Sequence, residues 1–165
     1  MNESLKKLAI ITGAARGIGL ATALLFNENG YKVAIVDNDK KEIDNLSFKN
    51  KDIKTFCFDI SNDDELDNMY NQILEWHNRI DVLVNNAGVA DFGNIEETNF
   101  KRWNEVMKTN LNGVFLCSQK VIIHLKKTKG NIINIASISG LRASTLRVAY
   151  GTSKAAVIQL TKQQA

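Results

Sequence analysis

The stretch KLAIITGAARGIG, residues 7–19, begins with an apolar run and ends among three glycines. A short apolar run that stops at a glycine turn is typical of a buried strand. Directly after it, apolar residues recur near helical spacing across residues 18–29, and Gly30 follows as a helix stop. The sequence therefore predicts a strand, a glycine turn and a helix in direct succession.

The same alternation continues along the rest of the chain. Further strands are predicted at residues 31–37, 53–60, 80–88 and 130–137, and further helices at 39–47, about 62–78, 100–126 and 148–165. Strands that alternate with helices favour a parallel sheet with helices on both faces. Right-handed crossovers then give an α/β, doubly wound, Rossmann-like sheet, and we expect residues 1–165 to form one domain.

The glycine turn has the features of a dinucleotide site. Gly13 allows a tight turn, Gly17 lets the backbone approach a ligand, and Gly19 allows the helix to pack closely on the strand. The free N–H groups of the helix N-terminus would then face a pyrophosphate. Asp37 ends the second strand, where a carboxylate accepts both ribose hydroxyls and repels a 2′-phosphate, so NAD is expected over NADP. Arg16, a cation in the turn, is a weaker argument for NADP.

The third strand ends in a second polar position. Asp59 is a candidate acceptor for the adenine amino group, with a helix-capping turn residue as the alternative. Ser61 is predicted to cap the next helix, because three acids follow it in the first turn, where they suit the helix dipole.

Composition excludes several classes of protein. The 165 residues are 44% hydrophobic and 24% charged, with a net charge of +3 and no basic stripe interleaved with aromatics, so we expect no nucleic-acid partner. Cys57 and Cys117 form no CxxC pair, and no cluster has ligand spacing, so we expect buried thiols, a reducing compartment and no metal. The N-terminal apolar run is too short for a membrane span or signal segment, and we expect a cytoplasmic protein.

Taken together, five motifs resemble the short-chain dehydrogenase/reductase family, in its typical NAD(P)-dependent branch. They are TGAARGIG (12–19), NNAG (85–88), Asn110, Ser137 and YGTSK (150–154). The resemblance runs from about Lys6 to the last residue. It implies a cofactor cleft lined by Gly13, Arg16, Gly17, Ile18, Gly19, Asp37, Asp59, Ile60, Asn86, Ala87, Gly88, Tyr150 and Lys154, with Gly88 leaving room on the adenosine side.

The same motifs suggest a chemistry. Tyr150 and Lys154 lie four residues apart and share one helix face. An ammonium beside a phenol favours the phenolate and lowers its pKa from about 10, so Tyr150 is the candidate general acid/base for a secondary alcohol or carbonyl. The resemblance implies that Lys154 also holds the nicotinamide ribose and that Asn110 holds a water in a proton relay. Ser137 would orient the substrate oxygen, with Ser139 in a secondary role.

Three functions stay open. The first is an NAD-dependent oxidoreductase acting on a sugar, polyol or small hydroxy compound. The second is a 3-oxoacyl-thioester reductase that prefers NADPH. The third, for this chain as it stands, is a non-catalytic fragment that binds cofactor or forms oligomers.

The chain also departs from the family pattern. The family adds a sixth strand, a proline-glycine turn with a substrate loop, and a seventh strand, whereas this chain stops within the tyrosine helix and has no proline. The resemblance therefore implies that the last strands are lacking, that residues 131–136 form an exposed edge strand, and that substrate selectivity cannot be deduced. It also implies a homo-oligomer, a dimer or tetramer, that uses helix 100–126. Trp103, Val106, Met107, Val114 and Phe115 would serve that surface or the core.

Overall fold

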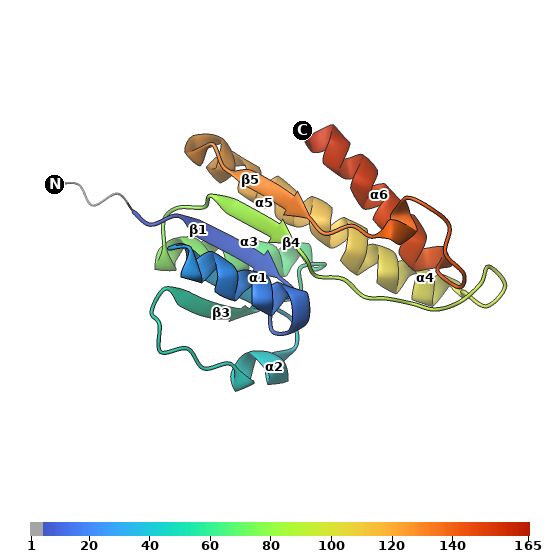
Figure 1. The fold of residues 1–165 in the computed structure, drawn as a ribbon, viewed down its shortest axis with the longest axis horizontal. Coiled ribbons are helices and arrows are strands. Elements are labelled where there is room, and N and C mark those ends of the chain that lie inside the picture. The colour runs from blue at the N-terminus through green and yellow to red at the C-terminus, as the bar shows by residue number, and fades with distance from the viewer. Residues whose placement is uncertain (1–4) are drawn as a thin grey trace.

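The computed structural model describes residues 5–165 and contains one five-stranded sheet (Figure 1). The strands are β1 (Leu8–Thr12), β2 (Lys32–Asp37), β3 (Ile53–Cys57), β4 (Val82–Asn85) and β5 (Asn131–Asn134). The helices are α1 (Gly17–Glu28), α2 (Lys40–Asn45), α3 (Asp63–Trp76), α4 (Phe100–Met107), α5 (Gly113–Thr128) and α6 (Val148–Gln164). A π-helical segment, η1 (Lys108–Asn112), joins α4 to α5, and a 3₁₀ turn, η2 (Ile138–Gly140), precedes α6.

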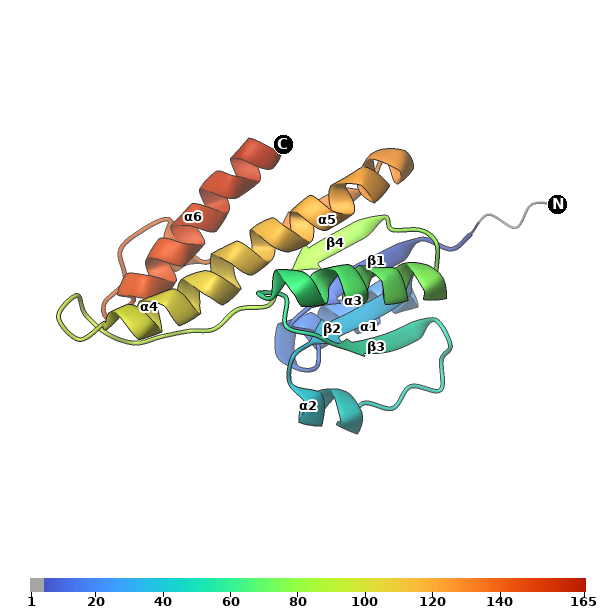
Figure 2. The same cartoon turned by 180° about the vertical axis from the view of Figure 1, so that it is seen from behind.

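All the strand pairs are parallel, and the strand order is β3-β2-β1-β4-β5. The chain moves outward from β1 to β3, crosses back to place β4 on the other side of β1, and then adds β5. Figure 1 shows α1 in front of the sheet, and the reverse view in Figure 2 shows α3 and α5 in front of it. The predicted doubly wound α/β sheet is thus confirmed.

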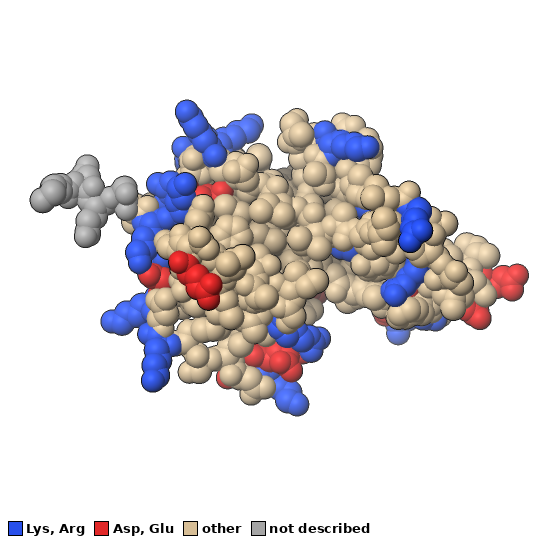
Figure 3. Space-filling model, in the orientation of Figure 1, with Lys and Arg blue, Asp and Glu red and all other residues tan. Residues whose placement is uncertain are grey.

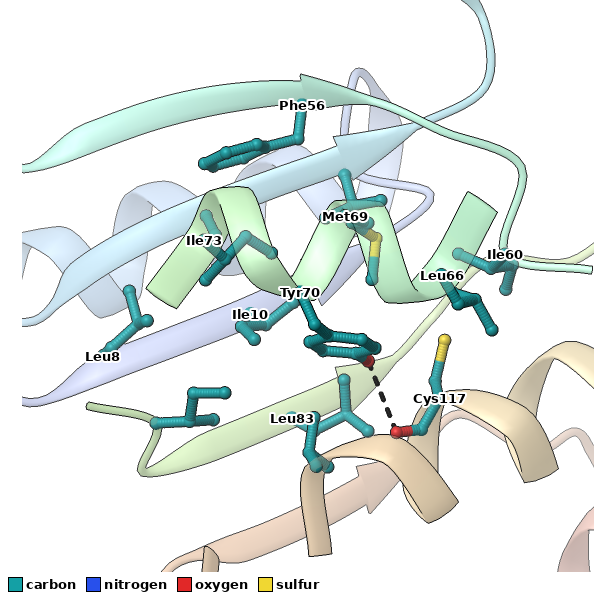
Figure 4. Close-up of a cluster of buried hydrophobic side chains, with 14 of the residues drawn as sticks. Leu8, Ile10, Phe56, Ile60, Leu66, Met69, Tyr70, Ile73, Leu83 and Cys117 are labelled. Atoms are coloured by element: carbon teal, nitrogen blue, oxygen red, sulfur yellow. Dashed lines mark hydrogen bonds between the residues drawn. The ribbon is translucent and has the colours of Figure 1, made fainter. Parts of the chain in front are cut away.

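Alternation along the strands builds a core on each face of the sheet. In β1, Leu8 and Ile10 point to the face covered by α3 and α5, while Ala9 and Ile11 point to the opposite face. All four side chains are fully buried, as expected of a central parallel strand. Figure 4 shows the first of these cores, where α3 side chains such as Met69 lie over the strands.

Within this core the hydroxyl of Tyr70 donates a hydrogen bond of 3.3 Å to the backbone carbonyl of Cys117 (Figure 4). Burial raises the pKa of Tyr70 well above its ordinary value and raises the pKa of the Cys117 thiol to about 12. Both groups are therefore neutral around pH 7. The other cysteine, Cys57, is exposed at the end of β3, so the expectation that both thiols are buried is wrong for that residue.

This difference predicts selective alkylation. Iodoacetamide at pH 8 should label Cys57 within minutes and leave Cys117 unmodified, because the thiolate is the reactive form and only about one Cys117 thiol in ten thousand would carry it. Mass spectrometry of tryptic peptides measures both sites. In urea both cysteines should react, and labelling of Cys117 in the folded chain would contradict the core described here.

Several boundaries differ from the sequence prediction. β3 and β4 end at Cys57 and Asn85, earlier than predicted, because turns begin there. The N-cap of α3 is Asn62 and not Ser61, since the Asn62 side chain accepts a hydrogen bond of 3.2 Å from the Asp64 N–H. The single helix predicted for residues 100–126 is interrupted by η1.

β5 lies at one edge of the sheet, as the resemblance implied. Its outward-facing Ile133 is 42% exposed, while Ile132 packs against the core under α5. Figure 3 shows the lysines and arginines of one face in separate groups and not as one continuous patch. Across residues 5–165, no helix is both long and apolar enough to cross a bilayer, and no three His, Cys, Asp or Glu side chains gather as a metal site.

Candidate active site

A cleft of about 340 Å³ opens at the carboxyl ends of β1, β2 and β4. This is the edge of an open α/β sheet at which ligands bind, and the strand order reverses here between β1 and β4. The predicted cofactor residues that line the cleft are Gly13, Arg16, Ile18, Gly19, Asp37, Asp59, Ile60, Asn86, Ala87 and Gly88. Gly17, Tyr150 and Lys154 are not among its lining residues.

The glycine turn between β1 and α1 is shaped by backbone contacts. Gly13 and Gly17 have φ angles of +61° and +57°, which a residue with a side chain adopts only under strain. A Cβ atom on Gly13 would lie 2.6 Å from the Cα of Ala87. A Cβ on Gly19 would lie 2.3 Å from the carbonyl oxygen of Gly13. The turn therefore brings the N-terminus of α1 directly against the loop that follows β4.

Asp37 ends β2 and holds this turn in place. Its two carboxylate oxygens accept hydrogen bonds from the backbone N–H groups of Ala15 (3.0 Å) and Asp39 (3.1 Å). Arg16 extends into solvent, with its guanidinium 3.7 Å from the Asp39 carboxylate. The negative charge of Asp37 thus lies at the rim of the cleft in a fixed position, partly exposed.

Asp59 has the turn role considered for it and also lines the cleft, so the adenine contact stays a prediction. One oxygen accepts hydrogen bonds from the N–H and hydroxyl of Ser61, at 2.9 and 2.6 Å, as a turn residue does. The other oxygen lies 3.9 Å from the ammonium of Lys108, and the residue still lines the cleft. Ile60, directly after it, is 5% exposed and packs beside Gly113.

The two asparagines at the end of β4 join three strands. Asn86 donates from its amide nitrogen to the carbonyls of Thr12 and Gly13, each at 2.9 Å. Asn85 is buried and donates to Ser118 and to Asn134 on β5. Thr12, which the sequence reasoning missed, is fully buried, and its hydroxyl accepts from the N–H groups of Asn86 and Ala87. A polar residue at the end of an apolar strand was the available signal.

Tyr150 and Lys154 lie on successive turns of α6, as predicted. The Lys154 ammonium is 5.9 Å from the centroid of the Tyr150 ring and donates a hydrogen bond of 2.7 Å to the carbonyl of Ile135. Lys154 is only 4% exposed, and burial lowers its pKa below the ordinary value. A Cβ on Gly88 would lie 3.6 Å from this ammonium. Gly88 therefore lies both at the wall of the cleft and beside Lys154, so the cleft ends next to the Tyr150–Lys154 pair.

Asn110 is fully buried in the π-helical segment η1. Its side-chain oxygen accepts from the N–H of Val89, and its nitrogen donates to the Val89 carbonyl and to the hydroxyl of Ser153. Ser153, also missed, donates in turn to the carbonyl of Tyr150. Asn110 thus fixes the loop after β4 against α6 and makes no side-chain hydrogen bond to Lys154 within the described residues.

Ser137 follows β5 and begins the 3₁₀ turn η2. Its hydroxyl oxygen accepts a hydrogen bond of 3.1 Å from the N–H of Ser139, so it acts as the cap of that turn. Ser139 has its own hydroxyl 3.2 Å from that of Ser144. η2 packs on α6, because Gly151 of α6 approaches the carbonyl of Ser139 closely. The sheet edge thereby gathers Ser137, Tyr150 and Lys154 on neighbouring elements.

Comparisons with known proteins agree with this architecture. The family model described as short chain dehydrogenase matches residues 7–165. The chain is 37% identical to a meso-2,3-butanediol dehydrogenase of Serratia marcescens over 96% of its length and 64% of that protein. It is also 37% identical to a 3-oxoacyl-[acyl-carrier-protein] reductase of Staphylococcus epidermidis, over 98% of the chain and 68% of the relative.

Solved structures give the same result. A 3-ketoacyl-(acyl-carrier-protein) reductase from Brucella melitensis, complexed with NADH, superposes with a TM-score of 0.91 at 32% identity. The match covers 98% of this chain and 70% of that one. A short chain dehydrogenase/reductase from Burkholderia phymatum in complex with NAD gives a TM-score of 0.90 at 29% identity, covering 99% and 60%. The chain thus spans about two thirds of the length of these relatives, and it belongs to the short chain dehydrogenase family.

Proposed function

We propose that this chain carries the cofactor half and the catalytic residues of an NAD(H)-dependent oxidoreductase that interconverts a secondary alcohol and a carbonyl. One observation carries the proposal. The cleft bounded by the glycine turn and Asp37 continues through Gly88 to the buried ammonium of Lys154, beside Tyr150. A dinucleotide laid along the cleft from the ribose end would bring its reacting ring to that pair.

The residues of the cleft fit such a cofactor. The backbone N–H groups at the start of α1 attract a pyrophosphate, and Gly17 has open space where a Cβ would be, so a phosphate can come close. The carboxylate of Asp37 matches two ribose hydroxyls. A bound nicotinamide dinucleotide would supply the hydride acceptor or donor.

The roles of the catalytic residues follow from their environments. In oxidation, Tyr150 takes the proton of the alcohol O–H as the carbinol C–H pair of electrons leaves as hydride and a carbonyl forms. Lys154 holds its ammonium group in a buried site, 5.9 Å from the centroid of the Tyr150 ring. Ser137 would orient the substrate oxygen. In reduction, Tyr150 returns the proton.

Asn110 would act in the proton relay through its backbone. Its side chain is engaged by Val89 and Ser153, so the carbonyl oxygen of Asn110 is the acceptor that would hold a water near Lys154. π-helical segments leave the pattern of backbone hydrogen bonds locally altered and are frequent at functional sites. The segment is therefore suited to this role.

The two curated relatives point to different classes of substrate. The similarity to the butanediol dehydrogenase supports a small hydroxy compound as the substrate of this chain. This agrees with the negative charge of Asp37, which supports a preference for NAD. The similarity to the 3-oxoacyl-[acyl-carrier-protein] reductase supports a thioester substrate. In that case we would expect NADPH as the cofactor. We favour the small hydroxy compound, because the carboxylate of Asp37 would repel the 2′-phosphate of NADPH. The third possibility is a chain that binds the cofactor without turnover. Only a measured reaction rate distinguishes it from the two enzymes.

We also propose a homo-oligomer. Val106 and Val114 are 2% exposed and belong to the core, so they do not form its surface. Phe100 and Phe115 are 76% and 46% exposed along the same helical stretch, and these two would contribute to a contact with a second copy.

Cofactor preference gives the test of the proposed function. We expect NADH to bind the chain about tenfold more tightly than NADPH, because Asp37 repels the 2′-phosphate. Asp37→Asn keeps an oxygen for the Ala15 N–H and removes the charge. It should therefore abolish most of the tenfold preference for NADH over NADPH. Cofactor fluorescence titrations, together with the rise in melting temperature, measure the binding.

Asp44→Asn is the matched control, since it removes a carboxylate from α2 that pairs with Lys40 and does not line the cleft. It should leave the ratio between the two cofactors unchanged. Tighter binding of NADPH by the unmodified chain would refute the assignment to Asp37, and binding of neither cofactor would refute the cleft.

A further inference from the structure

The side chain of Arg147, directly before α6, lies between two aromatic rings. Its guanidinium carbon is 3.8 Å from the centroid of the Phe92 ring and 5.3 Å from the centroid of the Tyr150 ring. The first distance is that of a cation–π stack, which covers one face of the planar guanidinium and leaves its N–H edges free. A positive charge is thereby fixed next to the proposed general acid/base.

The loop between β4 and α4 is braced in a way that keeps this stack in place. The N–H of Gly93 donates a hydrogen bond of 3.0 Å to the carbonyl of Leu146, and Gly93 pairs with Arg147 as an isolated parallel bridge. Arg102 donates to the carbonyl of Phe92 at 2.8 Å and forms an ion pair with Asp91. Phe92 and Arg147 come from distant parts of the chain, yet backbone contacts fix them together.

The charge of Arg147 has no acidic partner among residues 5–165. Arg16, Arg79 and Arg102 each have an aspartate within ion-pair distance. Arg147 is partly buried and contacts rings in place of a carboxylate. It also lines an open cavity of about 430 Å³ between η2 and the start of α6, so one side of it is open to solvent, although Tyr150 does not line this cavity. A preorganised, accessible guanidinium is the group that suits bidentate recognition of a carboxylate.

We propose that Arg147 binds a carboxylate on the substrate, so that the chain acts on short hydroxy acids and the corresponding oxo acids. The inference rests on the proposed role of Tyr150. The guanidinium carbon lies 5.3 Å from the centroid of the ring that carries the Tyr150 hydroxyl, so a substrate whose hydroxyl reaches Tyr150 needs only a short carbon chain to bring a carboxylate to Arg147. A 3-hydroxy acid of four carbons has such a chain.

The test compares two substrates that differ only at the recognised group. 3-Hydroxybutyrate and 1,3-butanediol share the reacting CH₃–CHOH–CH₂ unit and differ in a terminal carboxylate or hydroxymethyl group. We expect kcat/KM with NAD⁺ to be about tenfold to a hundredfold higher for the acid, the range of a hydrogen bond between charged groups. Most of the difference should lie in KM, because the carboxylate is bound equally before and during the reaction.

Three variants assign the preference to Arg147. Arg147→Gln should bring the ratio of acid to diol close to one, and Arg147→Lys should restore part of it. Lys162→Gln is the matched control, because it removes an equal charge from an exposed position near the end of α6, outside the cavity that Arg147 lines. It should leave the ratio as it is. Retention of NADH binding shows that each variant is folded.

The outcomes separate this inference from the proposed function. Equal kcat/KM for acid and diol would overturn the role of Arg147 and leave the oxidoreductase intact. If neither compound is oxidised, ligand-observed NMR in the presence of NADH measures their affinities without turnover. Tighter binding of the acid, lost in Arg147→Gln and kept in Lys162→Gln, supports the inference. Equal binding of the two compounds overturns it.

Discussion

Replacing Tyr150 by phenylalanine should lower kcat/KM for oxidation of a secondary alcohol by about 10²–10⁴-fold, the contribution typical of general acid–base catalysis. The hydroxyl is the only group removed, and the ring stays between Lys154 and Arg147. NADH affinity should change by less than about twofold, because the glycine turn, Asp37 and Lys154 are left as they are. Appearance of NADH absorbance with excess substrate measures the rate.

Tyr31→Phe is the control for this experiment. It removes the same hydroxyl from a partly buried tyrosine that packs edge-on against Phe26, far from the catalytic residues. Its rate should match that of the unmodified chain. An unchanged rate in Tyr150→Phe would disprove the catalytic role. If the unmodified chain binds NADH and oxidises no secondary alcohol, the non-catalytic function is the correct one.

Gly13→Ala should destabilise the fold strongly. The new Cβ would lie 2.6 Å from the Ala87 Cα and 3.0 Å from its nitrogen, and these backbone atoms cannot rotate away. The φ angle of +61° adds about 1–2 kcal/mol of strain to the clash, so we expect a loss of about 3 kcal/mol or more in the free energy of unfolding. For a chain of this size the melting temperature should fall by about 10 °C, and NADH binding should be lost.

Gly30→Ala separates strain from collision. Gly30 also has a left-handed φ, of +84°, but a Cβ there would meet no atom within 4 Å. Only the backbone term remains, so the melting temperature should fall by about 2–8 °C and NADH should still bind. Equal effects of the two substitutions, measured by calorimetry and cofactor titration, would show that the contact between the turn and Ala87 is unimportant.

Local patterns were enough to predict the sheet and most of the cleft. The glycine turn and Asp37 are set by spacing along one βαβ unit, and parallel topology then brings them to the same edge of the sheet. Tyr150 and Lys154 were predictable for the same reason, because four residues on a helix fix a shared face.

Features that depend on distant contacts were not predictable. Ser61 and Asn62 are both good caps, and the structure uses Asn62 because the Ser61 hydroxyl donates to Asp59. Nothing near Asn110 in the sequence shows that its side chain would bind Val89 and Ser153. The stack of Phe92 and Arg147 joins the loops that follow β4 and β5, which are far apart in the sequence, and neither loop carries a motif for it.

The π-helical segment η1 also constrains how this family can vary in length. An α-helix turns by about 100° per residue, so one residue more or fewer in Lys108–Asn112 would rotate everything after it by about that angle. α4 packs on α6, whereas α5 presents Cys117 and Val121 to α3. After deletion of one residue, α4 could not pack on α6 while α5 keeps Cys117 and Val121 turned toward α3. Insertions and deletions that surface loops tolerate should be absent from alignments of this segment.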